Sequence, residues 1–258
     1  MKKHLHYLLF TLFFFLGSSY TFAQLQKGAW KTIQLPKSFE SRDWAATAWT
    51  GTEFLYWGGS STDGRPADWK KTKAKGRYVP SNGFYFTDGW RINPTTGTCK
   101  PMPPSGLPIG FYKSAWTGRY LFVFNGRYMQ MKMYDAQKNV WKAISKVGLP
   151  RFQRMNLAVT WTGKEVMIWG GTNYQHTKFY NDGYLYNPET NRWRKMAPSP
   201  LISRGSPTSF NTNKEIIIYG GDHNKYLKDG AAYNPTSNTW RKITDNPYHK
   251  GHFFETKV

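Results

Sequence analysis

The chain has 258 residues and a single cysteine, which excludes an intramolecular disulfide, so its stability has to come from a packed core. Aromatic residues make up 18% of the sequence, and each can bury a large apolar area. The 36 Lys and Arg residues outnumber the 15 Asp and Glu residues, which gives a net charge of +21. This excess predicts attraction to anionic partners and binding that depends strongly on salt, but it does not specify a fold.

The first 23 residues have the order of features that is typical of a secretory signal peptide. Two lysines precede an apolar run over residues 7–16, and Thr21-Phe22-Ala23 places small residues where a signal peptidase cleaves. A membrane anchor, which is the alternative, needs about 20 apolar residues, roughly twice this run. We therefore expect residues 1–23 to be removed. Residues 24–258 would form one mature domain that is secreted, periplasmic or associated with the cell envelope.

Four segments repeat a first motif, in which two β-rich runs flank a tight turn and end at a glycine-rich stop. In each segment, the first residue of the glycine-rich stop lies seven positions after the turn residue. The pairs of turn residue and stop residue are Gly51 and Gly58, Gly118 and Asn125, Gly163 and Gly170, and Asn213 and Gly220. Gly and Asn tolerate the positive φ that a tight hairpin turn requires. Each segment therefore predicts a β-hairpin.

A second motif follows each hairpin and has its own fixed spacing. An aromatic or aliphatic residue begins an Asn-Pro or Asp-Ala turn, and the position seven residues later is tryptophan in three repeats and cysteine in one. The pairs are Ile92 and Cys99, Tyr134 and Trp141, Tyr186 and Trp193, and Tyr233 and Trp240. Asn-Pro favours a turn because proline fixes φ and asparagine can bond its own backbone. Each repeat is therefore predicted to be a four-stranded antiparallel meander.

The Gly-Gly stop after an apolar strand, followed by Asp-Gly, Tyr-Asn-Pro and Trp, resembles the kelch repeat of secreted bacterial kelch and galactose-oxidase-like propellers. The resemblance implies an all-β, kelch-type β-propeller with four full four-stranded blades around a channel. Residues 30–33 and 250–254 look like strands of a partial fifth blade built from the two termini. The alternative is a truncated propeller, whose open strand edges would favour aggregation.

Arginine occurs nine residues before the turn residue in three repeats, at Arg42, Arg154 and Arg204, whereas the second repeat has Ile109. Lys250 is the candidate equivalent in the fifth unit. The first strand of a blade lies innermost, so these side chains are expected beside the central opening. Together they would bind a carboxylate or sulfate, because a guanidinium group donates two parallel hydrogen bonds to such anions. The alternative is that each arginine bonds the backbone carbonyl groups of a neighbouring blade.

The loop after the second strand of the first repeat is a long basic insertion, residues 60–82. Its candidate binding residues are Trp69, Lys70, Lys71 and Lys73. Basic residues interleaved with aromatic ones could contact an acidic glycan, a lipid headgroup or nucleic acid. The alternative is a solvated loop that keeps the protein soluble.

The matching loops of the third and fourth repeats contribute Tyr174, His176 and His223 as further binding candidates. The two histidines do not occupy equivalent positions, and no tight carboxylate cluster accompanies them, so no metal site is expected. Galactose-oxidase chemistry would need a tyrosine cross-linked to a cysteine. Cys99 instead takes the tryptophan position of an outer strand, and no cofactor is expected.

These features favour a non-catalytic binding protein that recognises an anionic glycan or a protein partner through a basic loop face. An anionic membrane surface is a further candidate partner, and nucleic acid is the least expected one. The alternative is an acidic-sugar enzyme that resembles a sialic acid mutarotase. Such an enzyme needs a general acid or base near the arginines, for which Asp43 is the first candidate and Asp182 or Asp229 the second. A propeller fold does not by itself choose between these functions.

Overall fold

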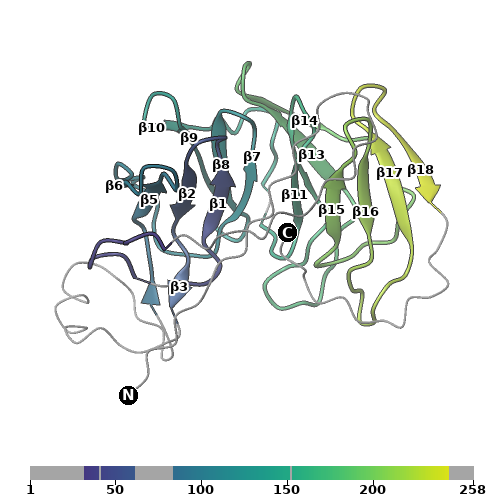
Figure 1. Cartoon of the computed structure of the whole chain (residues 1–258). Coiled ribbons are helices and arrows are strands. Elements are labelled where there is room, and N and C mark those ends of the chain that lie inside the picture. The colour runs from purple at the N-terminus through teal and green to yellow at the C-terminus, as the bar shows by residue number, and fades with distance from the viewer. Residues whose placement is uncertain (1–31, 41, 62–83, 152, 244–258) are drawn as a thin grey trace, which may run out of the picture. The chain divides into compact units, whose positions relative to one another are not determined.

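The computed structural model describes residues 32–40, 42–61, 84–151 and 153–243 (Figure 1). The first sheet contains β1 (Ala46–Trp49), β2 (Phe54–Trp57), β5 (Gly89–Ile92) and β6 (Cys99–Pro101). The second contains β7 (Lys113–Trp116), β8 (Tyr120–Asn125), β9 (Gln130–Asp135) and β10 (Val140–Ala143). The third contains β11 (Ala158–Trp161), β12 (Val166–Trp169), β13 (Gly183–Asn187) and β14 (Arg192–Lys195). The fourth contains β15 (Thr208–Asn211), β16 (Ile216–Tyr219), β17 (Gly230–Asn234) and β18 (Thr239–Ile243). A separate short pair joins β3 (Ser60–Ser61) and β4 (Phe84–Tyr85).

The predicted all-β fold with four four-stranded blades is confirmed, because each sheet is an antiparallel meander and no helix occurs among the described residues. The first strands of successive sheets are neighbours: β1 contacts β7, β7 contacts β11, and β11 contacts β15. The partial fifth blade was expected mainly from residues outside the described ranges, and the signal sequence also lies outside them. No helix in the described part of the chain is long and apolar enough to cross a membrane.

The predicted hairpin turns between the first and second strands adopt the expected backbone. Gly51 has φ of 99°, and Asn213, which replaces glycine in the fourth blade, has φ of 68°. A threonine before each turn adds a second constraint. The Thr50 hydroxyl accepts a hydrogen bond from the Glu53 amide at 2.9 Å, and Thr162 does the same for Glu165 at 2.9 Å. Local sequence therefore fixes these turns without help from the rest of the fold.

The turns between the third and fourth strands are also as predicted. Asn187 Oδ1 accepts hydrogen bonds from the Glu189 and Thr190 amides at 2.9 and 3.2 Å. Asp135, in the Asp-Ala variant of the motif, accepts the equivalent bonds from residues 137 and 138 at 3.1 Å. Because the side chain replaces a backbone partner, the chain reverses tightly at each of these positions.

Neighbouring blades pack face to face through three apolar clusters, one between each consecutive pair. The repeated tryptophan of the fourth strand ties each blade to the one before it. Trp141 Nε1 donates to the Pro103 carbonyl at 2.9 Å, and Trp193 Nε1 donates to the Ser145 carbonyl at 2.9 Å. Cys99 takes this position in the first blade, where burial raises the pKa of its thiol.

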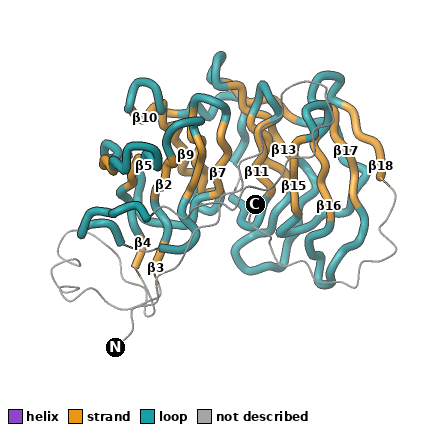
Figure 2. Tube along the Cα trace, viewed as in Figure 1, coloured by secondary structure: helices purple, strands orange, loops and turns teal. Residues whose placement is uncertain are grey.

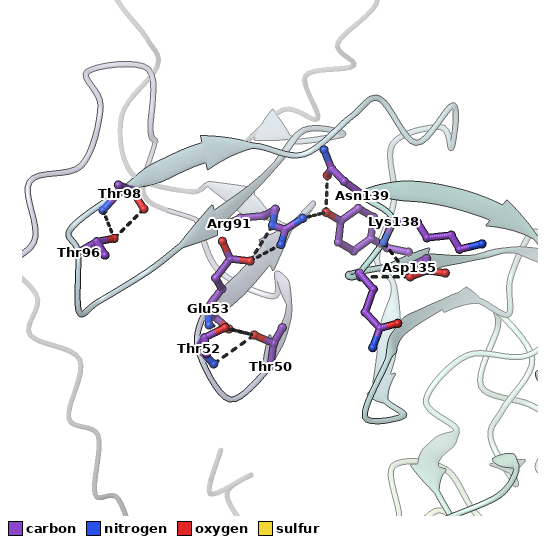
Figure 3. Close-up of polar contacts among 11 residues, drawn as sticks. Thr50, Thr52, Glu53, Arg91, Thr96, Thr98, Asp135, Lys138 and Asn139 are labelled. Carbon is purple, nitrogen blue, oxygen red and sulfur yellow. Dashed lines mark hydrogen bonds and ion pairs between the residues drawn. The ribbon is translucent and has the colours of Figure 1, made fainter.

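A polar link joins the first and second blades at the end where the short turns lie (Figure 3). Arg91 forms an ion pair with Glu53 and donates to the Tyr134 hydroxyl at 3.1 Å. That hydroxyl in turn donates to Asn139 Oδ1 at 2.6 Å. Arg194 makes a comparable link, since it pairs with Glu165 and donates to the Pro235 carbonyl of the fourth blade at 2.9 Å. These contacts serve the packing of the blades.

Candidate binding face

The two ends of the meanders differ in sequence and in length of connection (Figure 2). One end carries the short, repeated turns. The other end carries longer and more varied connections, and we call it the loop face. It consists of residues 42–45, 58–61, 86–88, 102–112, 126–129, 149–151, 153–157, 170–182, 199–207 and 220–229. Varied loops on a regular scaffold are where binding residues usually occur.

The structure places each of the three predicted arginines inside its own blade. Arg204 is fully buried and forms a bidentate ion pair with Asp229, at 2.9 Å for both contacts. Its remaining donors reach the carbonyl oxygens of Gly220 at 3.0 Å and Ile202 at 3.1 Å. The buried guanidinium is therefore satisfied by groups of the same blade.

Arg42 and Arg154 repeat this arrangement. Arg42 pairs with Asp88 at 2.8 Å, and Arg154 pairs with Asp182 at 2.7 Å. All three arginine side chains are at most 9% exposed, whereas the three aspartates are 36–40% exposed. The surface therefore presents the carboxylates and encloses the arginines. The partners belong to the same blade, not to a neighbouring one as the alternative interpretation expected. Anion binding by these arginines stays a prediction.

The second blade replaces the whole arginine–aspartate unit. Ile109 takes the arginine position, and the strand register places Gln130 where the other blades have aspartate. Gln130 Oε1 accepts a hydrogen bond from the Tyr112 hydroxyl at 3.2 Å instead. The arginine and the aspartate are thus absent together. This pattern indicates that the two residues act as one structural unit.

The ion pairs predict how stability changes in acid. Burial alone would raise the pKa of the Asp182 and Asp229 carboxyls, but the hydrogen bonds and charges of Arg154 and Arg204 outweigh it, and both pKa values lie below the usual one. Their stabilisation is complete above the ordinary aspartate pKa of about 3.9 and is lost as the pH falls through the lower folded-state pKa. We expect the free energy of unfolding to decrease steeply below pH 4. Urea unfolding between pH 2 and pH 6 should show a flatter profile for Asp229→Asn. Identical slopes for the variant and the wild type would contradict this account.

Several predicted residues lie outside the described ranges. They are Trp69, Lys70, Lys71 and Lys73 of the insertion, and Lys250 near the C-terminus. Their roles in binding stay predictions.

The structure places Tyr174, His176 and His223 on the loop face, but in different environments. Tyr174 is 56% exposed, and His176 is exposed in a turn where its φ is 56°. The His223 ring stacks on Phe179 with the ring centroids 4.5 Å apart, and its Nδ1 lies 2.6 Å from the Ser203 carbonyl oxygen. His223 therefore supports the loop structure. Among the described residues, no group of three or more His, Cys, Asp or Glu side chains is arranged to hold a metal ion.

The sequence patterns did not identify two exposed aromatic side chains on the loop face, Trp44 and Phe111. The position seven residues before the turn residue holds Trp44, Phe111, Asn156 and Ser206 in the four blades. Trp44 is 54% exposed and Phe111 is 50% exposed. Trp44 has φ of 59°, a left-handed conformation that suits asparagine but is strained for tryptophan. An exposed aromatic side chain held in a strained backbone is a candidate for ligand contact. Comparing the repeats at this position, as was done for the arginines, would have found it.

A second aromatic group on the loop face contains a cation. Arg127 and Tyr128 lie in the turn between β8 and β9, and Tyr174 lies in the loop between β12 and β13. The Arg127 guanidinium carbon is 3.6 Å from the centroid of the Tyr174 ring and 5.0 Å from that of Tyr128. The sequence gave no repeat signal for Arg127, because this turn has a different length in the other blades.

The sequence is similar to known kelch-repeat proteins. The family model described as the KLHDC2/KLHL20/DRC7 Kelch-repeats domain matches residues 75–252. The Rho GTPase-activating protein gacHH of Dictyostelium discoideum is 28% identical over 135 residues, covering 49% of this chain and 8% of that protein. The Rab9 effector protein with kelch motifs of Danio rerio is 30% identical over 119 residues, covering 41% of this chain and 32% of that protein. The chain therefore matches less than two thirds of the length of either relative.

Proposed function

Because this chain belongs to the kelch-repeat family, we propose that it is a binding protein that holds an acidic segment of a protein partner on its loop face. The predicted kelch repeat is confirmed, whereas the secreted bacterial, galactose-oxidase-like type stays a prediction. The family and its kelch-containing relatives indicate a protein-interaction role. The name of the Rab9 effector relative supports the proposal that the partner is a protein. Secretion, glycan binding and association with an anionic membrane stay predictions.

One observation carries the proposal: exposed apolar residues gather on the loop face. Of the eleven large hydrophobic residues that are exposed in the described part of the chain, six lie there: Trp44, Phe111, Tyr128, Tyr174, Ile202 and Tyr226. Aromatic residues and arginine are the types that most often dominate the energy of protein interfaces. The net charge of +21 favours an acidic partner.

The enzyme alternative has less support from the geometry. Asp182 and Asp229, two of its candidate acids or bases, are paired with arginine, and their pKa values are lowered. A general acid at neutral pH needs a raised pKa. The third candidate, Asp43, forms a backbone bridge with Ser60 at the end of the first blade. The side-chain contacts favour structural roles for Asp182 and Asp229.

The proposal predicts that the exposed aromatics carry binding energy. The full chain would be applied to an array of acidic peptides and acidic glycans at 50 and 200 mM salt. The combined variant Trp44→Asn/Phe111→Asn introduces the residue that the third blade has as Asn156. We expect this variant to bind the best peptide at least about tenfold more weakly, because central aromatic anchors contribute most to such interfaces. Fluorescence anisotropy would measure the affinity.

The matched control is Val140→Asn, which removes an exposed apolar side chain at the other end of the second blade. It should leave peptide affinity unchanged. Trp44→Asn should also relieve backbone strain, so this substitution is not expected to lower the unfolding midpoint. Binding that is lost while the midpoint is unchanged would therefore not be due to unfolding. Binding of glycans alone, or equal loss in Val140→Asn, would overturn the proposed function.

A further inference from the structure

Within the described ranges, the contacts of Arg127 are with aromatic rings and not with an acidic side chain. Its guanidinium lies over the Tyr174 ring of the third blade, with Tyr128 of its own turn beside it. Among the residues that the structure describes, no Asp or Glu forms an ion pair with Arg127. Acidic partners are instead paired with Arg42, Arg91, Arg119, Arg154, Arg194, Arg204 and Arg241.

The turn that carries Arg127 is fixed on both sides. Asn125 is buried, and its Oδ1 accepts from the Tyr128 amide at 3.4 Å. The Gly126 carbonyl accepts from the Arg154 amide at 3.1 Å, which ties the turn to the third blade. A side chain at Gly126 would collide with the Arg154 carbonyl, so the two blades approach closely here. Arg127 is therefore presented from a rigid junction.

The loop that carries Tyr174 is equally well ordered. Asn173 Oδ1 accepts hydrogen bonds from the Thr177 and Lys178 amides, both at 2.9 Å. The Asn173 amide group donates to Thr177 Oγ1 at 2.9 Å. These bonds hold Tyr174 in position without contact from a ligand. Little conformational entropy would then be lost when a ligand binds.

We propose that Arg127, Tyr128 and Tyr174 form a receptor for an acidic side chain, aspartate or glutamate, of the partner protein. This inference rests on the proposed function and identifies the part of the loop face that would read the acidic residue. A guanidinium stacked on an aromatic ring keeps its N–H donors at its edge, where they match the two oxygens of a carboxylate. Tyr128 and Tyr174 are 52% and 56% exposed and offer apolar surface to the residues beside that carboxylate.

The test measures binding of the strongest acidic peptide from the array and of its Glu→Gln or Asp→Gln counterparts. Arg127→Gln should lower the affinity for the acidic peptide at least about tenfold, because a charge-assisted hydrogen-bonded pair is lost. Arg127→Lys should restore only part of the affinity, since lysine keeps the charge but not the planar pair of donors. On the Arg127→Gln background, replacing the critical acidic residue of the peptide should cause no further loss.

The matched control is Arg151→Gln, which removes the same charge from an exposed position on the same face. It should change affinity by less than about twofold, because a solvent-exposed charge that does not hold the carboxylate is screened. Equal losses in Arg127→Gln and Arg151→Gln would overturn the receptor and leave only general charge attraction. If Trp44→Asn/Phe111→Asn abolishes binding while Arg127→Gln does not, the proposed function stands and the receptor is wrong. If the wild type binds no acidic peptide, both are wrong.

Discussion

Replacing Arg204 with isoleucine is expected to lower the free energy of unfolding by about 3 kcal/mol, because it removes one partner of a buried ion pair. The Arg204 guanidinium is fully enclosed and donates to both carboxylate oxygens of Asp229 and to three backbone carbonyl oxygens. The variant would leave the Gly220 and Ile202 carbonyl oxygens without this donor. Urea-induced unfolding followed by tryptophan fluorescence would measure the loss.

A second substitution tests whether the arginine and the aspartate act as one unit. The second blade combines Ile109 with Gln130 at these positions. We therefore expect Arg204→Ile/Asp229→Gln to be more stable than Arg204→Ile alone, by about 1 kcal/mol or more, as contacting residues are energetically coupled. Arg241→Ile, which breaks the exposed pair with Glu215, should cause a loss several times smaller than Arg204→Ile. A double variant no more stable than Arg204→Ile would contradict the interpretation.

Gly148→Ala is expected to destabilise the protein by about 3 kcal/mol, because a methyl group there collides with the backbone of the next blade. Gly148 has φ of 86°, and an added Cβ would lie 2.9 Å from the Trp193 carbonyl carbon and closer still to its oxygen. The neighbouring Val147 carbonyl accepts from the Trp193 amide at 2.9 Å, which holds the two segments together. The substitution therefore forces two blades apart.

Gly163→Ala provides the matched control. Gly163 has φ of 96°, but a Cβ there would meet nothing within 4 Å. This variant should lose only the cost of a left-handed backbone, about 1–2 kcal/mol. Chemical unfolding of both variants separates backbone strain from crowding. Equal losses would show that contact between the blades at Gly148 is not important for stability.

Short-range sequence patterns were enough to predict the blades. The hairpin at Gly51 depends on a threonine and on a residue that accepts positive φ, all within four positions. The turn at Asn187 depends on one side chain that bonds the backbone two and three residues later. Because these interactions are local, their spacing in the sequence revealed them. The apolar strands between them then had to pair as meanders.

The sequence did not predict what the arginines contact. Arg42 and Asp88 are 46 positions apart, so no local spacing pattern relates the two residues. Only the register of β2 and β5 brings the aspartate to the arginine. Spacing placed the arginines at the correct end of the strands. It could not show that their charges were already compensated within the blade.

The aromatic positions on the loop face also needed the structure. Trp44 is not part of a periodic pattern of hydrophobic residues in the sequence. Its left-handed backbone and its exposure are visible only in the folded chain. Arg127 and Tyr174 come from different blades and meet because the third blade packs against the second.

The sequence by itself therefore determined the repeat, the turns, the strand order within each blade and the basic charge. These features depend on backbone preferences and contacts between residues close together in the chain. The tertiary structure decided which charges are buried in pairs, which arginines are without an acidic partner among the described residues, and which aromatic rings are exposed. Those properties depend on register and on packing between blades, where residues 38 or more positions apart come into contact.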